Sequence, residues 1–239
     1  MNLFESLVDA VRWLQLWVFE GLVQPLLFAS GSMGLADVAF DFTEALVLGT
    51  IEVLVLALVL GGLERLVPAE PVIDRKAVRT DILYTLLHRL GGFGFMVFWL
   101  ITPLFDALEA WLRLLGLSRM NIDQIWPGVT DRPLVSFLIY LVVLDLVDYW
   151  MHRGQHRLQW WWQLHAVHHS QRQMTFWSDQ RNHLLDDLLR DALLAIVAIA
   201  VGVAPGQFVA LVIASRVLQS LQHANLRWRW PWGLERVLV

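Results

Sequence analysis

Residues 134–170 read LVSFLIYLVVLDLVDYWMHRGQHRLQWWWQLHAVHHS, an apolar run that passes directly into a histidine-rich one. The apolar part, residues 134–151, has the length and composition of a helix that crosses a membrane. Five of the chain's eight histidines then follow within eighteen residues: His152, His156, His165, His168 and His169. The stretch therefore predicts a membrane helix that ends at a cluster of ionisable rings.

The composition of the whole chain indicates an integral membrane protein. Of its 239 residues, 57% are hydrophobic and only 17% are charged, whereas soluble domains usually carry about 25% charged residues. The 13 tryptophans fit the same class, because tryptophan favours membrane–water interfaces. The small net charge of −4 argues against a nucleic-acid partner. The absence of cysteine excludes disulfides, thiolate zinc sites and iron–sulfur clusters.

Hydropathy predicts two earlier spans, residues 44–66 and residues 82–105, each long enough to cross about 30 Å of hydrocarbon. Glu52 lies inside the first span and should face protein rather than lipid. A polar connector with Arg75, Lys76 and Arg79 joins the two spans. Its basic residues indicate the cytoplasmic side.

A further apolar stretch, residues 192–218, is interrupted by Gly202 and Pro205. Each half alone is short for a crossing. The stretch forms either a tight helical hairpin that dips into the membrane or one kinked span.

These elements predict an all-α fold: an integral membrane helical bundle with a cytoplasmic, histidine-rich helical cap. We divide the chain into residues 1–43, an amphipathic region that lies along the membrane interface, and residues 44–239, the membrane domain. Two crossings after the connector return the chain to the cytoplasmic side at His152. The membrane is expected to be a bacterial inner membrane or the endoplasmic reticulum.

The spacing of the polar residues predicts that they share helix faces, because residues three or four apart lie on one side of a helix. Two helices packed together would then direct five imidazole rings into one gap, where neutral imidazole can bind zinc, copper or iron. Two carboxylates on the first helix could accept hydrogen bonds from the free N–H groups of these rings. The first face holds Asp145, Asp148, His152 and His156, and the second holds His165, His168 and His169.

Other interpretations of these side chains stay open. The clustered histidines could instead belong to a basic interfacial helix that touches lipid phosphates. His88, which stands alone, is expected to be a satisfied structural residue, and the run Trp160-Trp161-Trp162 is expected to anchor the chain at the interface.

Four motifs resemble the membrane fatty acid hydroxylase and sterol desaturase superfamily. They read DYWMHRGQH (148–156), WWWQLHAVHHS (160–170), RNHLLDD (181–187) and LQHANLRW (221–228). The resemblance adds His183 and His223 to the expected metal ligands, although members often have proline where this chain has Leu184. Members also carry a further HxxHH box shortly after this point, whereas this sequence ends WGLERVLV. We therefore expect it to be truncated at its C-terminus.

The resemblance implies a non-haem di-iron enzyme that uses O2 to hydroxylate or desaturate a C–H bond of a lipid, such as a fatty acyl chain or a sterol. Two iron ions would be the cofactor, with zinc as a possible substitute. Electrons must come from an external donor of the b-type cytochrome or ferredoxin class, since the chain has no flavin motif, haem-attachment motif or cysteine.

Two other functions are compatible with a histidine-rich membrane protein. One is a zinc-dependent membrane hydrolase, although the sequence has no HExxH motif. The other is a non-enzymatic haem protein whose histidines pair across helices as axial ligands.

Overall fold

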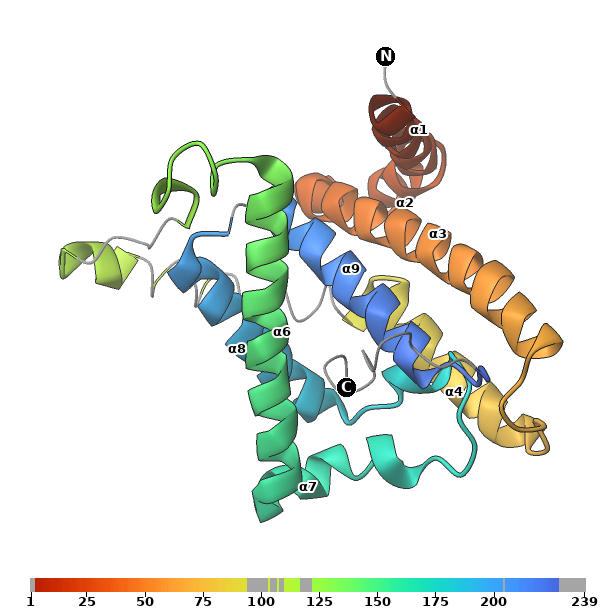
Figure 1. Ribbon diagram of the computed structural model, residues 1–239. Helices are drawn as coiled ribbons and strands as arrows, with labels where there is room; N and C mark the ends of the chain where they lie inside the picture. The colour runs from red at the N-terminus through yellow and green to blue at the C-terminus, as the bar shows by residue number, and fades with distance from the viewer. Residues whose placement is uncertain are drawn as a thin grey trace.

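The computed structural model describes residues 3–93, 103, 107, 110–116, 122–203 and 205–227. Helices form most of this part of the chain (Figure 1). They are α1 (Leu3–Val18), α2 (Gln24–Ala29), α3 (Ala36–Leu66), α4 (Arg75–Arg89), α6 (Pro133–Arg157), α7 (Gln159–His165), α8 (Leu184–Val201) and α9 (Pro205–His223). A short π-helix, η1 (Phe19–Val23), joins α1 to α2. The short 3-10 helices are η2 (Met33–Leu35), η3 (Ile122–Gln124), η4 (His168–Ser170) and η5 (Ser178–Gln180). These residues include no strand beyond an isolated bridge between Pro68 and Leu226, which confirms the all-α class.

Among the residues that the structure describes, two helices are long and apolar enough to cross a membrane, one over Met33–Leu66 and one over Pro133–Arg157. At 1.5 Å per residue, the shorter one extends about 37 Å, more than the roughly 30 Å of the hydrocarbon core. They correspond to the predicted spans 44–66 and 134–151, but α3 already begins at Ala36. The predicted span 82–105 lies largely outside the described residues. The surrounding membrane bundle and the cytoplasmic cap stay predictions.

The apolar stretch after residue 192 forms two helices, α8 and α9, rather than one kinked span. Gly202 ends α8 with a φ of 82°, in the left-handed region that favours glycine. The N–H of Gly202 donates to the carbonyl of Ile199, and that of Val203 donates to the carbonyl of Ala198, which is the Schellman pattern of a helix end. The chain then folds back, so the start of α8 and the end of α9 lie on the same side of the molecule.

The main hydrophobic core lies between α6 and this helical pair. Tyr140 of α6 and Leu211 of α9 have no exposed surface, and Leu144, Ala198 and Val201 are also buried. This packing holds α8 and α9 against α6, the helix that carries His152 and His156. In Figure 1, α6 passes in front of α8 and ends next to α7.

The polar connector is shorter than the sequence predicts, because helix α4 begins at Arg75. The Asp74 side chain caps this helix by accepting the backbone N–H groups of Lys76 and Ala77, each at 3.0 Å. Such a cap satisfies amide groups that have no partner within the helix. The predicted basic residues of the connector therefore lie on the first turns of α4.

The C-terminal end of α3 holds two distant segments that flank the histidine region. The Glu64 carboxylate accepts the backbone N–H groups of Phe176 and Asn225, both at 2.7 Å. The Asn225 side chain in turn bonds both backbone groups of Glu70. This arrangement explains the asparagine two residues after His223, since it fixes the chain as it leaves α9.

The N-terminal helix α1 packs on the first turns of α3. Gln15 donates a hydrogen bond to the carbonyl of Phe40, and the rings of Phe19 and Phe40 meet edge to face at 5.1 Å. Trp13 and Trp17 of α1 are exposed. The predicted placement of residues 1–43 along the membrane interface stays a prediction.

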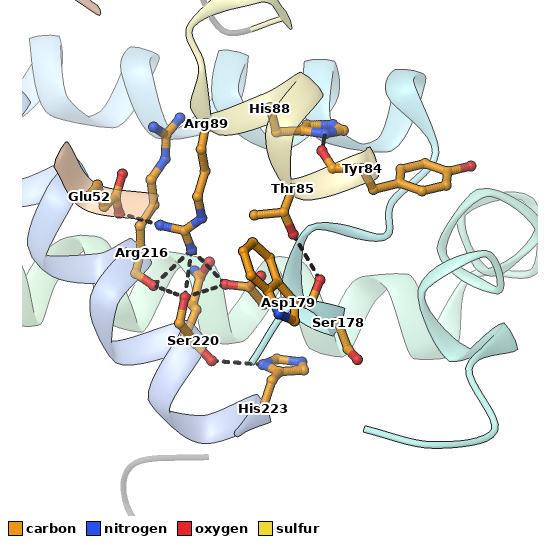
Figure 2. Close-up of polar contacts among 12 residues, drawn as sticks. Glu52, Tyr84, Thr85, His88, Arg89, Ser178, Asp179, Arg216, Ser220 and His223 are labelled. Atoms are coloured by element: carbon orange, nitrogen blue, oxygen red, sulfur yellow. Dashed lines mark hydrogen bonds and ion pairs between the residues drawn. The ribbon is translucent and has the colours of Figure 1, made fainter. Parts of the chain in front are cut away.

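A buried arginine connects the N-terminal helices to the end of α9 (Figure 2). Arg89 of α4 is 1% exposed and forms an ion pair with Glu52 of α3. Its other terminal nitrogen donates to Asp179 and to Ser220, both at 2.6 Å. The Ser220 hydroxyl also donates to Asp179 at 2.5 Å. Glu52 thus faces protein, as the sequence predicts, and the network ends one turn before His223.

Replacing Gly49 by alanine should destabilise the fold, because α3 and α4 touch there. A Cβ at this position would lie 1.6 Å from the carbonyl oxygen of Arg89, whereas one at Gly62 on the same helix would meet nothing within 4 Å. We expect Gly49→Ala to cost about 1–3 kcal/mol, as overpacking does, and Gly62→Ala to be neutral or stabilising by up to about 1 kcal/mol. Thermal unfolding of both variants in detergent measures the difference. Equal melting temperatures would contradict this packing.

Replacing Arg89 by methionine should leave Glu52 and Asp179 buried without their positive partner. Breaking a buried ion pair in this way costs about 3–5 kcal/mol. Arg190→Met is the matched control, because the Arg190–Asp148 pair has side chains that are 25% and 27% exposed. We expect a larger fall in melting temperature for Arg89→Met, and partial recovery when Glu52→Gln is added. A fall no larger than that of Arg190→Met would show that the network contributes little.

Candidate metal centre

Four histidines from three elements converge at the end of α6. His152 and His156 come from α6, His165 ends α7, and His169 lies in η4. Each offers a ring nitrogen, and these four atoms all lie within 4.8 Å of one another. The Nε2 atoms of His156 and His169 are 3.1 Å apart. His165 is buried and the other three are exposed, so the group opens to the surface on one side.

The local sequence folds the second motif back onto the first. Leu158 has extended backbone angles and separates α6 from α7. Trp161 then packs against Gly154, where an added Cβ would lie 3.0 Å from the indole ring. His165 therefore faces the helix turn that carries His152 and His156, with ring centroids 5.0 and 5.2 Å away.

The structure differs from the expectation that His165, His168 and His169 share one helix face. Helix α7 ends at His165, and η4 begins at His168 after a turn. His168 is directed toward α9, while His169 joins the four-histidine group. The tryptophan run also divides, because Trp161 is buried whereas Trp160 and Trp162 are exposed.

His168 and His223 form a second pair beside the first group. Their Nε2 atoms are 3.1 Å apart. The Nδ1 of His223 lies 2.8 Å from the carbonyl of Gln219 and donates to it, which leaves Nε2 to face His168. A pocket of about 140 Å³ adjoins the pair and is lined by His168, His169, Gln171, Met174 and His223.

The surroundings of His168 and His169 favour the neutral form of these two rings, which is the form that binds metals. Burial and the neighbouring rings of His223 and His165 lower the pKa of His168 to about 3. Burial and the ring of His165 also lower the pKa of His169. Both rings are therefore uncharged at neutral pH, with lone pairs available to a cation.

The nitrogen positions fit transition-metal ligation. Two nitrogens bound to one ion at about 2.1 Å are separated by roughly 3 Å, and both Nε2 pairs show 3.1 Å. Nε2 of His165 is buried without a hydrogen-bond partner. Buried polar atoms of this kind are rare unless an ion or water satisfies them. An all-imidazole set of donors suits zinc, copper or iron.

Three of the predicted site residues lie apart from the clustered rings. His183 is exposed and caps α8, where its Nδ1 accepts the N–H of Leu185 at 3.2 Å. Asp145 is exposed on α6. Asp148 accepts two hydrogen bonds from Arg190, at 2.7 and 2.8 Å, and one from Gln219. Neither carboxylate accepts a hydrogen bond from a histidine. His88 is buried against Asp187, with Nε2 and Oδ2 2.7 Å apart, as expected of a structural residue.

A carboxylate that the sequence pattern did not indicate, Asp186, contacts the cluster. Asp186, in the first turn of α8, accepts hydrogen bonds from Trp161 at 2.7 Å, Gln155 at 2.9 Å and His165 Nδ1 at 3.0 Å. Burial alone would raise the pKa of this carboxyl group, but the three hydrogen bonds hold that pKa below its usual value. The motif RNHLLDD contained the residue, but nothing in its spacing indicated contact with His165.

Comparison with known families gives a match over residues 137–239, which fit the fatty acid hydroxylase family. No curated protein and no solved structure matches the chain. The matched region contains α6 from residue 137 onward, all of α7, α8 and α9, and the seven histidines expected as ligands. The C-terminal region of the chain, residues 137–239, therefore belongs to the fatty acid hydroxylase family.

Proposed function

We propose that the protein is a membrane-bound di-iron oxidoreductase that uses O2 to hydroxylate or desaturate a C–H bond of a lipid. One observation carries the proposal: six histidine rings gather in two adjacent groups at the end of an apolar helix, within a region of fatty acid hydroxylase type. The family implies an oxidoreductase and is usually metal-dependent. The iron pair, the lipid class and the reaction are the parts that we infer.

The two groups of rings would hold one ion each. The first would be bound by His152, His156, His165 and His169, and the second by His168 and His223. Iron fits better than zinc, because oxidation of an unactivated C–H bond needs a metal that changes redox state. When bound, the iron pair would supply the activation of O2 and the removal of hydrogen from the lipid.

The chain's own residues would bring the lipid to the metal centre. The described part of α6 has a groove of about 350 Å³ lined by Val135, Leu138, Ile139, Val142 and Val143. The same helix ends at His152 and His156, so an acyl chain lying along it would approach the histidines from the membrane. Leu138 and Val142 are exposed on this face of α6, so it would lie against lipid if α6 crosses the membrane.

The reaction requires two electrons from outside the chain. Hydroxylation converts R–H, O2, two electrons and two protons into R–OH and water, and desaturation also consumes O2 and two electrons. The sequence contains no cysteine for a cluster. We therefore infer an external donor of the b-type cytochrome or ferredoxin class. Arg153, Arg157 and Arg172 are exposed near the histidines and could bind an acidic donor on the side that we infer to be cytoplasmic.

Features of the site disfavour the two other functions. A hydrolase needs a free carboxylate as general base, but Asp186 already accepts three hydrogen bonds. Haem needs room for a flat macrocycle between its axial ligands. The ring centroids of His152, His156, His165 and His169 lie only 4.7 to 6.4 Å apart, so no macrocycle fits among them.

Alanine at His168 or His169 should remove bound metal while the protein stays folded in detergent. Each substitution deletes a ring nitrogen from one of the two groups, and neither residue belongs to the apolar core. Iron and zinc content per chain, with circular dichroism as the check on folding, measures the effect. His183→Ala is the matched control, because this exposed ring caps α8, and we expect it to keep the wild-type metal content.

The same measurements separate the proposal from its alternatives. Two irons per chain without a Soret band support the oxygenase, whereas a Soret band would indicate haem. Wild-type metal content in both His168→Ala and His169→Ala would rule out the ligand assignment.

A further inference from the structure

Asp186 connects three elements of the histidine region through one buried carboxylate. It is 3% exposed. Its Oδ1 accepts hydrogen bonds from Gln155 of α6 and Trp161 of α7, and its Oδ2 lies 3.0 Å from Nδ1 of His165. Gln155 is the residue before His156 within the HxxxH motif. The carboxylate therefore contacts both histidine motifs from a third helix.

This contact determines which nitrogen of His165 can bind a metal. A carboxylate next to Nδ1 favours the tautomer with the proton on Nδ1, so the lone pair lies on Nε2. That Nε2 atom is buried and has no hydrogen-bond partner. The His165 ring is also central, with centroids 5.0 Å from His152 and His169 and 5.3 Å from His168.

We propose that Asp186 is the positioning residue of the metal centre: it orients His165, fixes its tautomer and so sets the affinity of the four-histidine group for its ion. This inference rests on the proposed function. A carboxylate that accepts the second N–H of a ligating histidine fixes its ring and raises its basicity, and removal of such a partner weakens metal binding about 10–100-fold. Asp186 contributes no atom to the ion itself.

The adjacent residue provides a matched control. Asp187 lies in the same first turn of α8 and also pairs with a buried histidine, since its Oδ2 is 2.7 Å from Nε2 of His88. His88 lies outside both groups of clustered rings. Asp186→Asn and Asp187→Asn therefore remove the same charge from the same helix turn, and each weakens one carboxylate–histidine pair.

The test measures Co²⁺ affinity of the intact, detergent-solubilised chain by competition with a chelator. We expect Asp186→Asn to weaken binding about 10–100-fold and to change the visible spectrum of bound Co²⁺. We expect Asp187→Asn to bind within about threefold of wild type. The melting temperatures of the metal-free proteins provide a second readout. If Asp186 had a purely structural role, both asparagine variants would have lower melting temperatures, but their Co²⁺ affinities would not differ from each other.

A second variant covers the case in which Asp186→Asn does not fold. Trp161→Phe keeps an aromatic ring at this position and removes the N–H that holds Asp186, so it should weaken Co²⁺ binding severalfold. Wild-type affinity in Trp161→Phe, or equal affinities in the two asparagine variants, would overturn the positioning role. Absence of Co²⁺ binding by the wild type would instead overturn the proposed function itself.

Discussion

The structure depends on one constraint: several imidazole rings are packed together at the end of an apolar helix, and their inward nitrogens need a partner. Ring centroids in the group are about 5 Å apart, and the buried Nε2 of His165 has no hydrogen-bond partner. Packing such groups together without compensation is costly, because buried polar atoms lose their bonds to water. A cation bound within each group would remove this cost for the ring nitrogens that face it. The geometry therefore favours metal binding over a purely structural cluster.

The rest of the fold holds these rings in place from several directions. Helix α8 contributes Asp186, which reaches both histidine motifs. Helix α9 presents His223, and Arg89 and Glu52 from α4 and α3 support the turn before it. Glu64 fixes the backbone just after His223. Helices outside the family-matched region thus take part in positioning the second pair of rings.

The sequence predicted the features that depend on local spacing. His152 and His156 are four residues apart on a helix, so their shared face follows from helix geometry, and α6 has it. The all-α class and the two apolar helices follow from hydropathy in the same way. The single helix expected for His165, His168 and His169 was wrong, because the chain turns after His165. Asp186 could not be identified, since its contact with His165 exists only once α8 packs against α6 and α7. The start of α4 was also missed, although Asp74 before Arg75 was a readable capping signal.

The central claim is that histidines from neighbouring segments hold a pair of transition-metal ions. X-ray absorption at the iron edge of the wild-type protein, purified with its metal, tests this claim most directly. We expect two irons per chain, a nitrogen and oxygen shell at about 2.1 Å, and the multiple scattering that several imidazole rings produce. Iron without imidazole scattering, or a protein that retains no transition metal, would contradict it.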